Sequence, residues 1–382
     1  DENDPNKLFF TCGDKRSNYI CISDDKGENI IQKTLPCSVH GNEVGRATGD
    51  RLIYKNGRLY FGSQTAGIIY SEDMGDSWQS VDLFGEKNIS LIWTDSEGKL
   101  FIAGCSGEAN SPDGVTRGHT LYCSTDGLKS FVPLTAPDPV KYENSSYYGF
   151  VPQRITSDSR YIYITFASSG EVFYGGMGAY ACDTGSLSGG KVYRYRIENG
   201  VPVFNKDITP EDHIPCGYSG ICSNGKMLLL STVCRKNGGD IIYTSTDSGE
   251  SWKIIMNRLE YCRFDWNIPY MKPRYNGGGN CVHWISDIKL SPFDSDTALF
   301  NTGTGLFMIT GLASGDVLVK PFCEGIEETV HLNVYTTPHG RNRIIDIIGD
   351  LGGFAFEDYD SECENSFANE NGDRYITCLN AD

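Results

Sequence analysis

The sequence lacks several features that would place a chain in a class at once. No apolar run approaches the roughly 18 residues that a membrane-spanning helix needs, so no membrane span is expected. The fourteen cysteines include no Cys-x-x-Cys pair and the six histidines are scattered, so the spacing of a zinc site is missing. Neither a metal nor another cofactor is therefore expected. No signal peptide is present, and we interpret Asp1 as a mature or trimmed start.

The sequence also has fewer positively charged than negatively charged residues. Lys and Arg number 33 against 50 Asp and Glu, which gives a net charge of −17 and a pI of about 4.8. An anionic surface repels phosphate backbones and acidic headgroups, so nucleic acid and membrane surfaces are not expected as partners. Neutral glycans carry no charge and stay open as partners.

Helical periodicity is absent as well. No segment shows a sustained 3.6-residue apolar period, and no low-complexity linker divides the chain. The 44 glycines, 22 tyrosines and 18 phenylalanines instead favour many short strands joined by tight turns. We expect an all-β fold with one domain over 1–356 and an acidic C-terminal tail over 357–382. Cys363 and Cys378 would pin this tail through disulfides.

The cysteine content points to an oxidising compartment. Fourteen cysteines without a metal pattern indicate disulfides, whose connectivity the sequence leaves open, and a secreted, extracellular protein. The triplets that begin at Asn88 and Asn144 match the acceptor pattern for N-glycosylation in a eukaryotic host.

A turn motif, Ser-x-Asp-x-Gly-x-x-aromatic, recurs along the chain and is the Asp-box (BNR) repeat. It occurs at 71–78 and 245–252, with weaker copies at 23–30 and 124–131. The Asp side chain is expected to accept N–H groups of its own turn, the Gly to take a backbone conformation that other residues resist, and the aromatic to pack beneath the hairpin. The box therefore predicts a hairpin and no chemistry. Its structural residues are Asp25, Asp73, Trp78, Asp126, Asp247 and Trp252.

The spacing of the boxes predicts the architecture. The first three boxes begin 48 and 53 residues apart, which is the length of one four-stranded blade. Alternating strands continue between and after the boxes, to about Phe356. We count about seven blade-like units, and predict an all-β, about seven-bladed β-propeller with Asp-box hairpins.

Several stretches, in the same order and at similar separations, resemble the N-terminal propeller portion of the xyloglucanases of glycoside hydrolase family 74. They read GNEVGRATGDRL at 41–52, ISDIKLSPFDSD at 285–296, GTGLF at 303–307 and GDLGGF at 349–354. The resemblance covers roughly residues 1–356. It implies a propeller of the kind that family members use in pairs, with a glycan cleft between the two. It also implies cleavage of β-1,4-glucans, chiefly xyloglucan, by two aspartates with inversion.

The resemblance also implies site residues. Asp350 matches the aspartate of the family's Asp-Leu-Gly-Gly-Phe-like motif, and Gly352 and Gly353 would let a sugar ring approach the backbone. An inverting mechanism needs a second carboxylate about 6.5–9.5 Å away. The family's other aspartate lies in a Thr-Asp-Ile-Gly-Gly motif that these 382 residues do not contain. Asp287, which follows Trp284 in a motif that the family shares, is the nominated substitute, although an aspartate in this place is more often a strand-start residue.

Aromatic side chains could stack on sugar rings. The candidates are Trp93, Trp266, Trp284, Tyr147 and Tyr148, each of which could instead belong to the core. Residues 330–356 would take the place of the family's first blade and close a single ring, or the chain would form a shorter open fragment.

Three functions remain open at this point. The chain could be an inverting hydrolase of xyloglucan or a related β-glucan. It could be a non-catalytic extracellular propeller that binds glycan or assembles with copies of itself or other subunits through the propeller. A peptide-binding propeller of the sortilin type is supported by the boxes alone.

Overall fold

The computed structural model describes most of the chain, in the ranges 4–13, 16–39, 49–109, 118–138, 140–141, 147–148, 150–168, 189–211, 216–233, 235, 239–257, 261–268, 282, 284–303, 305–326, 330–349 and 352–361. Every regular element in these ranges is a β-strand, which confirms the predicted all-β class there. A search of the same ranges finds no helix that could cross a membrane. The chain divides into two compact units: unit 1 is Asp1–Leu228 with Asp247–Ser251, and unit 2 is Leu229–Thr246 with Trp252–Asp382.

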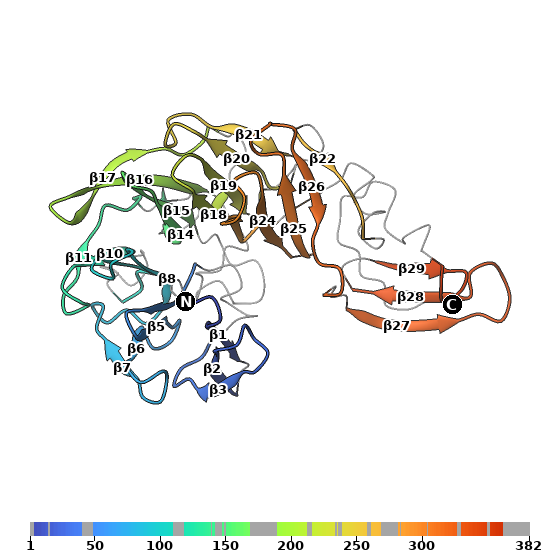
Figure 1. Ribbon diagram of the computed structural model, residues 1–382, viewed down its shortest axis with the longest axis horizontal. Coiled ribbons are helices and arrows are strands. Elements are labelled where there is room, and N and C mark those ends of the chain that lie inside the picture. The colour runs from blue at the N-terminus through green and yellow to red at the C-terminus, as the bar shows by residue number, and fades with distance from the viewer. Residues whose placement is uncertain are drawn as a thin grey trace. The chain divides into compact units, whose positions relative to one another are not determined.

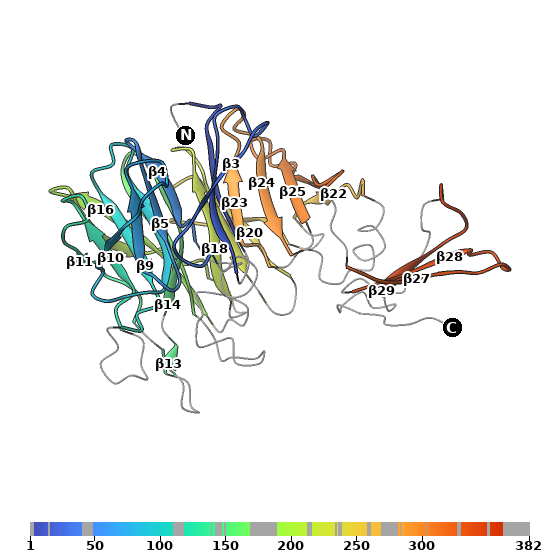
Figure 2. The same cartoon turned by 90° about the horizontal axis from the view of Figure 1, so that it is seen from below.

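Unit 1 contains four antiparallel sheets whose strands follow one another in chain order (Figures 1 and 2). The sheets are β1–β2–β3, β4–β5–β6–β7, β8–β9–β10–β11 and β14–β15–β16–β17. A short ribbon, β12–β13, precedes the last of them in sequence, and β18 follows it. The strands are β1 (Leu8–Gly13), β2 (Asn18–Ser23), β3 (Ile31–Thr34), β4 (Leu52–Lys55), β5 (Arg58–Gly62), β6 (Ile68–Ser71), β7 (Gln79–Val81), β8 (Ile89–Thr94), β9 (Phe101–Cys105), β10 (Leu121–Ser124), β11 (Val132–Pro133), β12 (Val140–Lys141), β13 (Tyr147–Tyr148), β14 (Phe150–Ser157), β15 (Tyr161–Ser168), β16 (Gly190–Glu198), β17 (Val201–Asp207) and β18 (Gly217–Ser223).

Unit 2 begins within β19. Here β20 pairs with β21, a five-stranded sheet has the order β22–β26–β25–β24–β23, and a three-stranded sheet has the order β27–β28–β29. The pairing of β22 with β26 is parallel. The strands are β19 (Leu228–Val233), β20 (Ile242–Ser245), β21 (Lys253–Met256), β22 (Arg263–Phe264), β23 (Asp287–Leu290), β24 (Ala298–Thr302), β25 (Gly305–Thr310), β26 (Leu318–Pro321), β27 (His331–Thr336), β28 (Ile344–Ile348) and β29 (Gly352–Phe356).

The structure does not test several of the features that the sequence predicts. The single domain over 1–356, the tail over 357–382, the number of blades and the closure of a ring stay predictions. Residues 362–382, with Cys363 and Cys378, lie outside the described residues, as do Cys182, Cys234 and Cys281. The pairing of the fourteen cysteines is likewise a prediction.

The predicted Asp-box segments form hairpin turns held by one recurring set of hydrogen bonds. Asp73 Oδ1 accepts from the Ser77 N–H at 2.8 Å, and Oδ2 accepts from the Ser77 hydroxyl at 2.5 Å. The Ser71 hydroxyl donates to Asp73 at 2.8 Å and accepts from the Gly75 N–H at 2.7 Å. Gly75 has a φ of +87°, a backbone conformation that glycine adopts easily. The equivalent pairs in the other turns are Asp25–Asn29, Asp126–Ser130 and Asp247–Ser251.

The aromatic residues of the two strong boxes pack inward, as a hairpin device requires. Trp78 packs against the apolar cluster between the first two sheets of unit 1. Trp252 meets the Tyr243 ring edge-on, with 6.4 Å between ring centroids. The carboxylates are hydrogen-bonded within their own turns and the rings pack against the core or the hairpin, so these turns shape the fold.

The core of unit 1 lies between consecutive sheets. Side chains of the first and second sheets form one cluster, those of the second and third another, and those of the third and fourth a further one. In β9, Ile102 joins the cluster shared with the fourth sheet, whereas Phe101 and Ala103 join the cluster shared with the second. Successive residues of a strand point to opposite faces, so both faces of this sheet are buried. This explains why β9 is apolar throughout.

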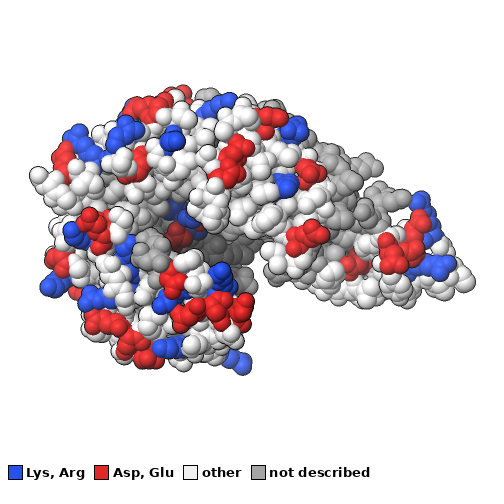
Figure 3. All heavy atoms as spheres, viewed as in Figure 1, with Lys and Arg blue, Asp and Glu red and all other residues white. Residues whose placement is uncertain are grey.

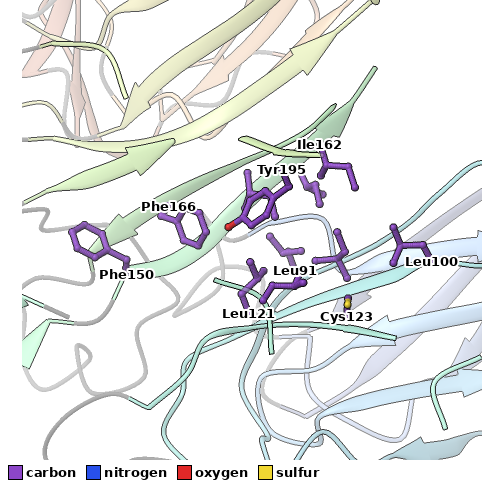
Figure 4. Close-up of a cluster of buried hydrophobic side chains, with 12 residues drawn as sticks. Leu91, Leu100, Leu121, Cys123, Phe150, Ile162, Phe166 and Tyr195 are labelled. Atoms are coloured by element: carbon purple, nitrogen blue, oxygen red, sulfur yellow. The ribbon is translucent and has the colours of Figure 1, made fainter. Parts of the chain in front are cut away.

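Tyr195 is among the largest side chains that are fully buried in this packing. Figure 4 shows it with Phe166 of the fourth sheet, close to Leu91 and Leu121 of the third. Its hydroxyl donates to the Thr135 carbonyl at 2.6 Å. The ring therefore fills the space between two sheets, and its one polar atom is hydrogen-bonded.

We predict two separable effects at Tyr195. Tyr195→Phe removes the bond to Thr135 and should lower the free energy of unfolding by about 1 kcal/mol. Tyr195→Ala also leaves a cavity and should lower it by about 3–5 kcal/mol. Urea unfolding followed by tryptophan fluorescence measures both, and equal losses in the two variants would contradict the packing described here.

The exposed turns predict sensitivity to acid. Hydrogen bonds from Ser77 and Ser130 lower the pKa of Asp73 and of Asp126 from 3.8 to about 2. Between about pH 4 and pH 2 the unfolded chain binds more protons than the folded chain, so stability should fall as the pH falls through this window. Melting curves of the wild type should show a melting temperature that falls between pH 4 and pH 2. A double variant, Asp73→Asn with Asp126→Asn, should show a smaller fall. Identical pH profiles of the two proteins would refute the contribution of these two carboxylates.

Candidate functional site

The motif that resembles the family's catalytic segment connects β28 to β29. Ile348 lies opposite Gly352 in this antiparallel pair, so Gly349, Asp350 and Leu351 form the connection. Gly353 has a φ of +145°, which L side chains rarely adopt and which accounts for a glycine at this position. Asp350 lies outside the described residues, so the structure gives the strands that carry it, and its catalytic role stays a prediction.

A groove of about 600 Å³ lies on the same three-stranded sheet. Its lining residues come from all three strands and from the segment after β29: His331, Leu332, Asn333, Val334, Ile344, Asp346, Phe356, Asp358, Tyr359 and Ser361. A turn holds that last segment, because the Asp358 N–H donates to the Ser361 hydroxyl, which in turn donates to the Asp358 carbonyl. Tyr359 is 90% exposed. No sequence pattern pointed to this groove, because its residues come from separate strands.

The polar residues of the groove include a histidine–carboxylate pair. His331 Nδ1 lies 2.9 Å from Asp346 Oδ1 and 2.9 Å from Oδ2, and the Asp346 side chain is only 15% exposed. Nearby on β27, the Asn333 amide donates to the Tyr335 hydroxyl at 2.9 Å. Carboxylates, an amide, aromatic rings and aliphatic side chains together are a suitable lining for a polyhydroxylated ligand.

Asp287, the nominated second carboxylate, is the first residue of β23. Its Oδ1 accepts from the Ile288 N–H at 2.9 Å, and its Oδ2 lies 3.3 Å from Lys289 Nζ. Its own N–H donates to the Asn301 side chain on the neighbouring strand. These contacts are those of a residue that begins a strand. A catalytic role for Asp287 stays a prediction.

The candidate stacking tryptophans contact other parts of the protein. Trp93 packs against the cluster between the third and fourth sheets. Trp266 stacks on Phe264, with ring centroids 4.9 Å apart and planes at 2°. Trp284 is partly buried and has a φ of +65°. Tyr147 and Tyr148 form β13, and the structure describes only their backbone. Glycan contact by any of them stays a prediction.

Of the two predicted glycosylation acceptors, the structure describes only Asn88. Asn144 lies outside the described residues. Asn88 is 5% exposed, so a glycan on its amide would need this segment to move. Within the ranges that the structure describes, no three His, Cys, Asp or Glu side chains gather in a way that could hold a metal ion.

Asp240 is a buried carboxylate that the sequence did not single out. It is 1% exposed and lies in unit 2, just before β20. Oδ1 accepts from the Thr232 hydroxyl at 2.8 Å and from the Arg235 N–H at 3.0 Å, and Oδ2 accepts from the Ile285 N–H at 3.0 Å. The carboxylate thus joins the end of β19 to the segment that leads into β23. Burial outweighs these bonds and raises its pKa from 3.8 to about 6.

We predict that Asp240 makes unit 2 less stable as the pH rises from 4 to 7. Its pKa is higher in the folded chain than in the unfolded chain, so between these values the folded chain binds more protons, and its stability falls with rising pH. The loss is on the order of 3 kcal/mol. Urea unfolding at several pH values should show that the free energy of unfolding of the wild type falls between pH 4 and pH 7. Asp240→Asn cannot titrate, and an unchanged fall in this variant would disprove the role.

Comparison with known proteins gives relatives along nearly the whole chain. No protein-family model matches it. An oligoxyloglucan-reducing end-specific xyloglucanase of Emericella nidulans is 24% identical over 422 residues, covering 94% of this chain and 50% of the relative. A xyloglucanase of a Paenibacillus species is 24% identical over 426 residues, covering 96% and 38%. The chain therefore spans about half the length, or less, of these curated relatives.

A solved structure supports the fold. The family 74 xyloglucanase of Xanthomonas campestris superimposes with a TM-score of 0.74 at 22% identity, covering 97% of this chain and 52% of that one. At this identity the match establishes the fold, which is propeller-like and built of successive antiparallel sheets. The predicted resemblance to glycoside hydrolase family 74 is confirmed: over more than nine tenths of its length, the chain is similar to xyloglucanases of that family.

Proposed function

We propose that the chain is a secreted, family-74-like propeller that acts on β-1,4-glucans, xyloglucan above all, as an inverting glycoside hydrolase. The observation that carries the proposal is that the relatives aligned with more than nine tenths of the chain are named xyloglucanases. Because the chain spans only part of their length, the activity, the substrate and the partners of the whole protein are all part of this proposal. The sheets would be blades of a propeller of about seven blades.

The proposed chemistry follows from inversion. One carboxylic acid protonates the glycosidic oxygen that leaves, and one carboxylate removes a proton from the water that attacks the opposite face of the sugar. Asp350 would serve as one of the two. Inversion requires the second group on the far side of the sugar ring, so a second carboxylate must complete the site. The sequence nominates Asp287, but its contacts with Lys289 and the Ile288 N–H argue against that role.

The sheet that carries Asp350 offers a place for a sugar chain. The groove over β27, β28 and β29 has the Asp346–His331 pair on its polar side and Phe356 and Tyr359 among its apolar side chains. Sugar faces pack on aromatic rings, while hydroxyl groups pair with carboxylates and amides. Acidic and basic side chains are interspersed over the face shown in Figure 3, which suits a neutral polymer better than a polyanion.

A non-catalytic propeller with a glycan-binding or assembly role is the second candidate. The contacts of Asp287 favour it, because a carboxylate held by Lys289 and by a backbone N–H at a strand start is not placed as a proton donor to a sugar. The sequence contains a single Asp-Leu-Gly-Gly-Phe motif, which is consistent with this reading.

We predict that Asp350→Asn abolishes the release of reducing ends from xyloglucan while glycan binding stays nearly unchanged. The amide keeps the size of the side chain but cannot transfer the proton, so the rate should fall by about 10²–10⁴-fold or more. The assay compares wild type and variant between about pH 4 and 7, the range in which a carboxylate pair would be active. Binding is measured separately by affinity electrophoresis in xyloglucan.

Asp287→Asn is the matched control. Its present contacts lead us to expect that turnover survives, whereas a loss as large as that in Asp350→Asn would make Asp287 the second carboxylate. If the Asp350→Asn variant released reducing ends as fast as the wild type, the catalytic role proposed for Asp350 would be refuted. A wild type that binds xyloglucan and releases no reducing ends at any of these pH values would favour the non-catalytic candidate.

A further inference from the structure

The first sheet of unit 1 brings two cysteines into contact. Cys12 lies on β1 and Cys21 on β2, and their sulfur atoms are 3.3 Å apart. Both are thiols in this structure. Cys21 is fully buried, whereas Cys12 is partly exposed. The groove proposed for the glycan is lined by residues 331–361 and includes no residue of this sheet.

The strand register explains the contact. Cys12 lies opposite Tyr19, and Cys21 lies opposite Phe10, so the two cysteines are diagonal neighbours on one face of the antiparallel pair. Residues of the other face, Ile20 and Ile22, turn instead toward the second sheet. The sulfurs have to close by only roughly 1 Å to reach the length of a disulfide bond.

A competing cysteine is held on the other side of this sheet. Cys37 packs against the apolar cluster that contains Ile20 and Ile22. Because side chains alternate along β2, this cluster lies on the face opposite to Cys21. The register thus favours Cys12 over Cys37 as the partner of Cys21.

We propose that Cys12 and Cys21 form a disulfide when the chain folds in the presence of a low-molecular-weight disulfide such as oxidised glutathione. The Cys12 thiolate attacks one sulfur of the oxidant, forms a mixed disulfide and expels one small thiolate. The Cys21 thiolate then attacks the Cys12 sulfur and expels the second small thiolate. Two protein thiols are oxidised, one small disulfide is reduced to two thiols, and the two cysteine protons pass to the solvent and the leaving thiolates.

The burial of Cys21 determines at which stage of folding the disulfide forms. Burial, together with the neighbouring Cys12, raises the pKa of the Cys21 thiol to about 11. The thiolate needed for the second step is therefore scarce once the sheet has formed. Refolding in a glutathione redox buffer should give the bond much faster than adding the same buffer to the reduced, folded chain.

Trypsin provides a direct test on the full chain, because Lys15 and Arg16 separate the two cysteines. After denaturation, blocking of thiols with N-ethylmaleimide and digestion without reductant, Cys12 lies in peptide 8–15 and Cys21 in peptide 17–26. We expect one species with the summed mass less two hydrogens, which reductant splits. Cys37 falls in a third peptide, 34–46, so a wrong partner would be recognised.

Cys12→Ser is the control variant, since it removes the partly exposed partner and leaves the buried one. In it, peptide 17–26 should carry the alkyl group, and the β1 amides should exchange hydrogen about tenfold faster or more than in the oxidised wild type. Wild-type protein that yields both peptides alkylated and separate overturns the proposal. Joining of either peptide to 34–46 overturns it as well.

Discussion

Unit 1 depends above all on the burial of apolar side chains between consecutive sheets. A sheet with a neighbour on each side must present apolar groups on both faces, and β9 does so, with Ile102 toward one neighbour and Phe101 and Ala103 toward the other. In a sheet with one face exposed to solvent, apolar and polar residues would alternate along each strand instead. This constraint removes polar side chains from the middle of the strands and leaves the strand ends and turns to carry them.

The polar groups at those ends meet two different environments. In the Asp-box turns the carboxylates are exposed, and hydrogen bonds to the turn lower their pKa. At Asp240 the carboxylate accepts hydrogen bonds from Thr232, Arg235 and Ile285, yet its pKa rises because water is excluded. The carboxyl group therefore favours its charged form in the exposed turns and its neutral form at the buried strand end of Asp240. Desolvation decides the difference.

Much of the architecture could be predicted because its causes are local. An Asp, a Gly and an aromatic within eight residues predict a hairpin, and the turns at Asp73 and Asp126 form as expected. The role of the sixth residue after the box serine was less visible: Ser77 and Ser130 supply the hydroxyl that donates a hydrogen bond to the aspartate. The all-β class followed from composition, and the family resemblance from motifs that are short and ordered along the chain.

The rest of the candidate site could not be predicted, because its contacts join residues distant in sequence. Asp240 reads as the first residue of a strand, and only the fold brings the Ile285 N–H to it, 45 positions further on. The groove beside Asp346 joins three strands with the turn after them. Cys12 and Cys21 were two of fourteen equivalent candidates until the register of β1 against β2 set them on one face. Pairings of this kind depend on register, which composition does not specify.

The chain-order connection of the strands has a consequence for the order of assembly. In the meander sheets each strand meets one that was synthesised just before it, so the loops to be closed are short and pairing can follow synthesis. The pairing of β22 with β26 is different, because β23, β24 and β25 lie between them in sequence. β22 cannot pair until β26, the last strand of this sheet along the chain, has been synthesised. The contact that completes this sheet therefore belongs to the last stage of its assembly, although β22 is its first strand along the chain.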